Sequence, residues 1–187
     1  MGRSIPKVLD DDEADDLVEV FNTRYDSGLK NRCMIRLMLE CGLRVSEVSD
    51  LKRDHTDLMA CQLVVREGKG SKDRTLWFPE DLQELLAEWL ERRPETDASW
   101  IFPTRSGSRT NPRSIRRTVK TYAGKAGISW AEDVSPHTLR HTFATRLLRR
   151  TGNIRLVQKA LGHSDLSTTM IYTHIVDEEL ESAMKGG

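Results

Sequence analysis

The chain has 187 residues, of which 37% are hydrophobic and 31% charged, and its formal net charge is zero. This length can bury one core, and this composition excludes a wholly disordered chain. No apolar run is long enough for a membrane-spanning helix, and the N-terminus has no signal-peptide segment. Cys33, Cys41 and Cys61 form no CxxC pair, and their odd number favours reduced thiols, with Cys41 in the core. We therefore expect a soluble, cytoplasmic, globular protein.

The zero net charge hides an uneven distribution along the chain. Residues 10–19 carry seven acids and no base, whereas residues 101–131 carry seven bases and no acid. Such a separation can leave one basic face for a phosphate backbone, although solvated helix faces explain charge runs equally well. The seven bases are Arg105, Arg109, Arg113, Arg116, Arg117, Lys120 and Lys125.

Three helices are expected near the N-terminus. Asp10 or Asp11 caps the first helix, whose early carboxylates favour the positive end of the helix dipole. The second helix runs from about residue 29 to residue 40 and stops at Gly42, because its apolar residues recur at helical spacing up to that glycine. The segment "LRVSEVSDLK" then starts a short third helix.

The middle of the chain predicts a β-hairpin followed by two helices. Residues 61–67 and 74–78 read as strands on either side of "GKGSKD", a glycine-containing turn. Apolar residues between 82 and 90 recur at i, i+3, i+4, i+7 and i+8, which predicts an amphipathic helix that ends before Pro94. A loop and a basic helix follow, and the helix is expected to bury Ile115, Val119, Tyr122 and Ala126.

The last third of the chain is predicted to be helical. Ser135 and Pro136 suit the N-cap and first turn of a helix that carries His137 and ends at Arg150. Asn153 caps a short helix that ends at "LGH", where glycine suits the left-handed position after a helix. Residues 165–174 form another helix, and "DEELESAMKGG" is a helical tail. Together these elements predict one mainly helical α+β domain with a β-hairpin.

Two histidines raise the question of a metal. His137 and His141 are four residues apart on one predicted helix, which is the ligand spacing of the helical zinc proteases. The residues between them include no glutamate, and Arg140 would repel a cation. Ligand type and supporting residues therefore argue against zinc.

Residues 154–174 also resemble a helix-turn-helix in the order of their elements. They predict a helix, a tight glycine turn and a second helix. The second helix offers Ser167, Thr168 and Thr169 to read bases, but no arginine, asparagine or glutamine. A DNA-binding regulator that never cuts its DNA remains an alternative.

Taken one at a time, several residues of interest also have purely structural explanations. Arg44 could pair with Glu47 on a helix surface, Tyr172 could belong to the core, and His163 could cap a helix. Taken together, they suit phosphoryl transfer without a metal. Two guanidinium groups can meet the charge that develops on a phosphate, and a tyrosine can act as the nucleophile.

Four segments carry a family resemblance. "CGLRVSEVSDLK", "GKGSKDR", "SPHTLRHTFATRLL" and "VQKALGHSDLSTTMIYTHI" resemble the signature segments of the tyrosine recombinases, the phage-integrase superfamily, and among them the Xer-type enzymes. They occur in the family's order and spacing, and the match runs from about Ile5 to the C-terminus. The resemblance implies the mainly α catalytic-domain fold of the family, with a small antiparallel sheet.

The resemblance also assigns roles around a scissile phosphate. Arg44 and Arg140 would grip the phosphate, and His163 would hydrogen-bond it. His137 would assist proton transfer, and Glu47 would support the site by orienting Arg44.

The nucleophile and the general acid are assigned in the same way. Tyr172 would form a 3′-phosphotyrosyl bond and release a 5′-hydroxyl, and Lys69 would protonate the departing oxygen, with Lys72 as the second choice. Exchange of one phosphodiester bond for another conserves bond energy, so the reaction implied needs no cofactor and no metal.

The partner implied is double-stranded DNA, bound by a homotetramer that carries out integration, excision or resolution, with the monomer as the alternative state of the free protein. A type IB topoisomerase-like relaxation is the nearest enzymatic alternative. We expect residues 1–187 to be a catalytic domain without the family's N-terminal core-binding domain, either an excised fragment or a naturally minimal recombinase. Its tail would dock on a neighbouring protomer or fold back. The expected DNA contacts are Lys72, Arg74, Arg105, Arg109, Arg113 and Arg116.

Overall fold

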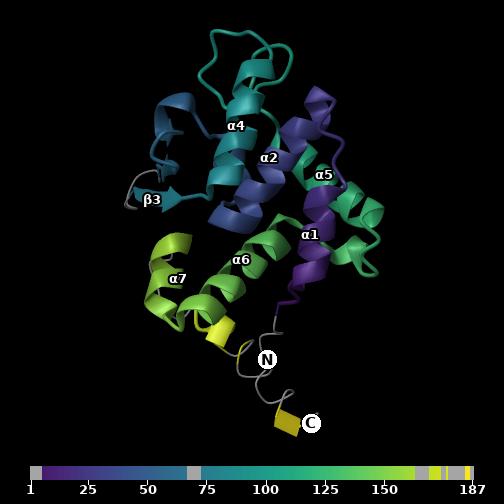
Figure 1. Cartoon of the computed structure of the whole chain (residues 1–187), viewed down its shortest axis with the longest axis vertical. Helices are drawn as coiled ribbons and strands as arrows, with labels where there is room; N and C mark the ends of the chain where they lie inside the picture. Colours follow the sequence, from purple (N-terminus) through teal and green to yellow (C-terminus); the bar gives the residue numbers. More distant parts are fainter. Residues whose placement is uncertain (1–5, 67–72, 163–168, 174–175, 177–183, 186–187) are drawn as a thin grey trace.

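The computed structural model describes residues 6–66, 73–162, 169–173, 176 and 184–185 (Figure 1). Helix α2 (Asp26–Cys41) runs through the middle of the molecule and packs against α4, α5 and α6. Ten of its sixteen residues are buried, so apolar side chains cover most of its circumference and not one stripe only. The other elements are α1 (Asp11–Glu19), α3 (Val45–Ser49), η1 (Arg53–His55), β1 (Thr56–Asp57), β2 (Gln62–Val65), β3 (Arg74–Trp77), α4 (Glu80–Arg92), α5 (Pro112–Lys125), η2 (Ala131–Asp133), α6 (Pro136–Thr151) and α7 (Ile154–Leu161).

The caps predicted for the first two helices are confirmed. Asp10 accepts a hydrogen bond from the backbone of Glu13, and the Glu13 carboxylate accepts one from the backbone of Asp10, which forms a capping box. Helix α2 starts three residues earlier than expected and ends at Gly42, whose φ is 64°. A Cβ at Gly42 would lie 2.3 Å from the ring of Phe143, so both its backbone angle and its surroundings require glycine.

The predicted hairpin is present within a three-stranded antiparallel sheet. Strands β2 and β3 pair from Gln62 opposite Trp77 to Val65 opposite Arg74, and both are shorter than expected. The short strand β1, which the sequence did not predict, pairs with the other edge of β2. The turn "GKGSKD", with Lys69 and Lys72, lies outside the described residues apart from its last position.

Helix α4 fulfils its prediction, whereas the buried stripe of α5 differs from the expected one. Helix α4 extends to Arg92 and so ends before Pro94 as expected. On α5, Ile115 and Val119 are buried as predicted, but Ala123 takes the third buried position. Tyr122 and Ala126, which were also expected in the buried stripe, are only half-buried. The Tyr122 ring stacks on Phe21, with centroids 4.0 Å apart.

Two hydrophobic clusters divide the core. The larger gathers residues from α1 to the start of α6, and the smaller consists of Ala144, Leu148, Val157, Leu161 and Tyr172. Helix α6 therefore contributes to both clusters, and its expected N-cap at Ser135 and first-turn Pro136 are confirmed. Asn153 caps α7, which ends at Gly162 with a φ of 66°, also as predicted.

The cysteines and the apolarity of the helices were the subject of two further expectations. Cys33 and Cys41 are buried and Cys61 is half-buried, and all three are free thiols. Within the described ranges, no helix has the length and apolarity needed to cross a membrane.

Candidate active site

Arg44 stands at the N-cap of α3, and Glu47 three residues later holds it there. The Glu47 carboxylate accepts a hydrogen bond of 2.7 Å from the Arg44 backbone N–H and one of 2.8 Å from Arg44 Nη1. A glutamate at the third position of a helix reaches back to the N-cap by its normal geometry, so the sequence "RVSE" sets this contact locally. The Arg44 side chain keeps 37% of its surface exposed. One guanidinium is thus both oriented and open to solvent.

Arg140 approaches the same carboxylate from the second turn of α6, in the interior. It is 5% exposed, and its Nη1 donates to the carbonyl of Gly42 and lies 3.8 Å from Glu47 Oε2. Its Nη2 donates to the carbonyl of Leu161 at 2.6 Å. Burial, together with the charge of Arg44, lowers the pKa of Arg140 to about 10, so the side chain is still charged at neutral pH.

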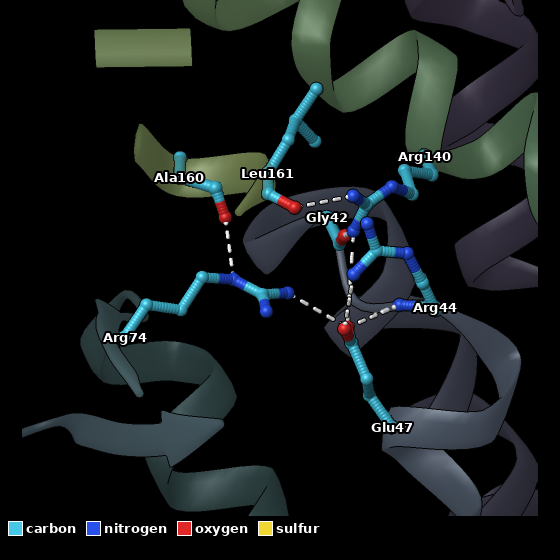
Figure 2. A network of polar contacts seen from close by, with 7 residues as sticks. All are labelled: Gly42, Arg44, Glu47, Arg74, Arg140, Ala160 and Leu161. Carbon is cyan, nitrogen blue, oxygen red and sulfur yellow. Dashed lines mark hydrogen bonds and ion pairs between the residues drawn. The ribbon is translucent and has the colours of Figure 1, made fainter. Parts of the chain in front are cut away.

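A third guanidinium, that of Arg74, completes the group. Arg74 begins β3, is 7% exposed, and donates from Nη2 to Glu47 Oε2 at 2.8 Å and from Nε to the carbonyl of Ala160 at 2.9 Å. Figure 2 shows Arg44, Arg74 and Arg140 converging on Glu47 from three different elements. The expectation that Arg74 faces DNA does not agree with this inward orientation, which follows from the alternation of side chains along β3.

The charge balance of this group is positive. Burial alone would raise the pKa of Glu47, but the hydrogen bond and charge of Arg74, with the Arg44 backbone N–H and the charge of Arg140, lower it below its ordinary value. One carboxylate among three guanidinium groups leaves an excess of positive charge beside the exposed part of Arg44. Such an arrangement of fixed donors suits a phosphate group.

Tyr172 lies in the smaller hydrophobic cluster and is 2% exposed. Its hydroxyl shares a hydrogen bond of 2.8 Å with Nδ1 of His141 on α6. Burial raises the pKa of Tyr172 to about 12, although the charges of Arg140 and Arg44 act in the opposite direction. Burial also lowers the pKa of His141 to about 4, helped by the charges of His137 and Arg140. His141 is therefore neutral at pH 7.

His141 is the residue that sequence reasoning missed. It was considered only as a zinc ligand, yet it contacts the expected nucleophile. The signal was its position directly after Arg140 in "HTLRH". Within the part of the chain that the structure describes, no group of three or more His, Cys, Asp or Glu side chains could hold a metal ion.

Of the remaining expected site residues, some lie on the surface and others fall outside the described residues. His137 is exposed in the first turn of α6, near enough for its charge to affect the pKa of His141. Lys69, Lys72 and His163 fall outside the described residues. Thr169, one of three residues expected to read bases in a helix-turn-helix, is fully buried, which argues against that motif. The expected DNA contacts exposed on the surface are Arg105, Arg109, Arg113 and Arg116.

Comparison with known proteins gives the family. The model of the Phage integrase family matches residues 7–179, so the chain belongs to that family. It is 37% identical to the tyrosine recombinase XerA of Pyrococcus furiosus over 98% of this chain and 62% of that protein. It is 35% identical to XerC of Alcanivorax borkumensis over 99% of this chain and 61% of that protein. The chain thus spans about three-fifths of the length of these relatives.

Solved structures agree with this assignment. The crystal structure of XerA recombinase superposes with a TM-score of 0.85 at 35% identity, over 99% of this chain and 66% of that one. A post-cleavage complex of XerH recombinase bound to a palindromic difH substrate gives a TM-score of 0.84 at 29% identity, over 97% of this chain and 53% of that one. The mainly helical fold with a small antiparallel sheet, expected from the resemblance, is confirmed.

Proposed function

We propose that this chain is the catalytic domain of a site-specific recombinase, which cleaves and rejoins DNA strands through a 3′-phosphotyrosyl intermediate. The observation that carries the proposal is the pairing of Arg44 and Arg140 across one carboxylate, next to a buried tyrosine. Membership of the phage integrase family and similarity to Xer recombinases support it. Its three free cysteines suit a cytoplasmic protein that acts on cellular DNA.

In the proposed reaction, Tyr172 attacks the phosphorus of a phosphodiester. The new bond joins the tyrosine oxygen to phosphorus, the bond to the 5′-oxygen breaks, and the 3′ side of the strand stays on the protein. Negative charge builds on the non-bridging oxygens, where Arg44 and Arg140 stabilise it. The 5′-oxygen leaves as a hydroxyl that takes a proton from Lys69, with Lys72 as the second choice.

Proton transfer and phosphate contact complete the roles. His137 assists removal of the tyrosine proton, since it stands one turn before Arg140 and is exposed. His163, which follows the C-cap residue Gly162 in the sequence, donates a hydrogen bond to the phosphate. Reversal of the same steps with a new 5′-hydroxyl rejoins the strand.

The nucleophile must move before it can react. Tyr172 is 2% exposed and its hydroxyl is hydrogen-bonded to His141, so in this position the hydroxyl cannot reach the phosphate of a bound DNA duplex. A pKa of about 12 also disfavours ionisation in this position. Binding of DNA would bring the hydroxyl out of the smaller cluster and toward the arginine pair.

The proposed partner is duplex DNA, and the proposed assembly is a homotetramer of four catalytic domains on two DNA sites. XerH recombinase has been solved in pre-cleavage and post-cleavage complexes with difH substrate, and these complexes support a DNA substrate for this chain. Among the expected contacts, Arg105, Arg109, Arg113 and Arg116 are exposed as this proposal requires.

The test is covalent trapping on DNA. A library of nicked duplexes with randomised sites, incubated at low salt, should yield a protein–DNA adduct that survives denaturation, and peptide mass spectrometry should locate the DNA on Tyr172. The Tyr172→Phe variant should give no adduct, whereas Tyr25→Phe, a change at an exposed tyrosine, should give the wild-type amount. Adduct formation by Tyr172→Phe, or DNA binding without any adduct, would contradict the proposal.

The trapped site then distinguishes recombination from topoisomerase activity. Two duplexes with the selected site should exchange strands in the presence of the protein. Relaxation of a supercoiled plasmid without strand exchange would instead support the type IB topoisomerase-like alternative.

A further inference from the structure

We infer that Arg74 is a positioning residue for strand cleavage, which holds Glu47, and through it the phosphate-binding arginines, in register with the C-terminal end of α7. The inference rests on the proposed function and adds a residue to it. Arg74 was expected to contact DNA, but its buried guanidinium contacts the protein instead.

Arg74 occupies a buried position on the inner face of the sheet. Residues of β3 alternate between buried and exposed positions, so Arg74 shares the inner face with Leu76, while Thr75 and Trp77 face outward. The register places Arg74 opposite Val65, at the end of the hairpin ladder nearest the turn that contains Lys69. A buried cation is costly unless it is paired and hydrogen-bonded. The position is therefore suited to a guanidinium with defined partners.

The Glu47 carboxylate connects Arg74 with Arg44. Its Oε2 accepts from the Arg44 backbone N–H at 2.7 Å and from the Arg74 side chain at 2.8 Å, whereas Arg140 lies farther from the same atom, at 3.8 Å. Its Oε1 accepts from Arg44. Because the two oxygens of a carboxylate move together, a bond that fixes Oε2 also fixes the direction in which Oε1 holds Arg44. Arg74 thus orients Arg44 through the Glu47 carboxylate.

Arg74 also binds the C-terminal end of α7. The last carbonyls of a helix have no partner within the helix and need donors from elsewhere. The carbonyl of Ala160 accepts from Arg74 and that of Leu161 accepts from Arg140, so two arginines bind successive carbonyls at this helix end. Cations at a helix C-terminus are also favoured by the helix dipole. Helix α7 is therefore fastened to β3 and to α6 at the point where the chain leads on to Tyr172.

Together these contacts make Arg74 the link between three signature segments. It belongs to the hairpin segment, it pairs with Glu47 of the segment around α3, and it holds the end of α7 in the fourth segment (Figure 2). Loss of this link should displace the reacting groups by a fraction of an ångström to an ångström. Misplacement on that scale costs on the order of 100-fold in rate.

The experiment separates the chemical step from DNA binding. The Arg74→Gln protein and the wild type are compared on the trapped nicked substrate, with the cleavage rate measured in single turnover at saturating protein. The dissociation constant is measured as a function of salt. We expect the Arg74→Gln rate to fall on the order of 100-fold with an unchanged dissociation constant and salt slope. Arg24→Gln, which removes an exposed arginine away from the site, is the matched control and should cleave at the wild-type rate.

A double variant tests the route through Glu47. If Arg74 acts by holding Glu47, Glu47→Gln and Arg74→Gln should together cost much less than the product of their separate effects. Full multiplication of the two effects would show that Arg74 acts independently and would overturn the inference.

The remaining outcomes are also decisive. A wild-type cleavage rate in Arg74→Gln overturns the inference, and so does a weaker dissociation constant with a salt slope reduced by about 1, which would mark Arg74 as a phosphate contact. Should Arg74→Gln fail to fold, Arg74→Lys is compared in the same two assays. It keeps the charge but loses the planar fork that presents separate nitrogens to Glu47 and Ala160, so it should show an intermediate rate at unchanged affinity. Failure of the wild type itself to form any adduct would count against the proposed function and not against this inference.

Discussion

At the scale of single residues, the three arginines of the site differ in what surrounds them. The Arg44 side chain is 37% exposed and the Arg140 side chain 6%. Arg140 is also occupied by two backbone carbonyls, those of Gly42 and Leu161. An arriving phosphate would therefore meet Arg44 first, and Arg140 would act from within as a fixed charge of the fold. A preorganised charge of this kind needs no rearrangement during the reaction.

Burial of His141, together with the charges of His137 and Arg140, leads to a pH dependence of stability. The pKa of His141 is lowered to about 4 in the folded protein, against about 6.5 in an unfolded chain. Between these pH values the unfolded state binds more protons than the folded state. The contribution of His141 to the free energy of unfolding is therefore complete above pH 6.5 and is lost as the pH drops toward 4. The difference corresponds to at most roughly 3 kcal/mol, and partial exposure of the ring should reduce it to roughly 1–2 kcal/mol.

We therefore expect His141→Gln to flatten the decline in stability between pH 6.5 and pH 4, measured by urea unfolding at several pH values. His55→Gln, a change in the short helix η1, should keep the wild-type slope. Identical slopes for wild type and His141→Gln would show that His141 is not held neutral by the fold.

At the scale of elements, the helix ends carry most of what the sequence alone could reveal. Ser135, Asn153, Gly42 and Gly162 are caps whose residue types act over a few positions of the chain, and all four were predicted. Such contacts are local, so their signal survives in the sequence.

The environment of Arg74 could not be predicted in the same way. Its partners Glu47 and Ala160 lie 27 and 86 residues away. The sequence shows only a basic residue next to a turn with two lysines. This pattern does not tell whether the guanidinium points into the protein or toward DNA. The same limit explains the stripe of α5, where Tyr122 and Ala123 both fit helical spacing and the neighbouring α1 decides between them. The two-residue strand β1 is too short for any period to show.

The end of α2 allows a prediction about stability. Gly42 has a φ of 64°, and a Cβ there would lie 2.3 Å from the Phe143 ring. Gly42→Ala combines left-handed strain with this clash, and we expect a loss of roughly 2–4 kcal/mol of unfolding free energy. Because the Gly42 carbonyl accepts from Arg140, cleavage of DNA should also slow.

Two matched glycines separate the causes. Gly152 has a similar φ of 62° with no atom within 4 Å of an added Cβ, so Gly152→Ala should cost only about 1 kcal/mol. Gly124 lies inside α5 with open space around it, so Gly124→Ala should be neutral or stabilise by up to about 1 kcal/mol. Equal losses at Gly42 and Gly152, measured by chemical denaturation, would exclude the clash with Phe143.

At the scale of the whole molecule, separation of charge along the sequence is not the same as separation in space. The acidic helix α1 packs against the basic helix α5 (Figure 1). Several exposed bases also have acidic partners: Arg109 pairs with Asp50, and Lys120 with Glu132. The positive field expected from residues 101–131 is thus partly balanced by neighbouring acids, and the binding of DNA depends on those cations that still reach a phosphate.

The salt dependence of DNA binding measures how many cationic side chains contact a phosphate. Each phosphate contact made by a cation contributes about 0.9 to the slope of log affinity against log salt on duplex DNA. Arg113 and Arg116 are exposed on α5, and we expect the double change to Gln to lower the slope by nearly 2 while the single-turnover rate on saturated DNA falls far less than affinity does. Arg74→Gln should do the reverse, because its guanidinium is turned toward Glu47 and Ala160. A slope unchanged by the loss of Arg113 and Arg116 would mean that DNA lies against another face of the molecule, and the basic helix would then be a solvated surface like the acidic one beside it.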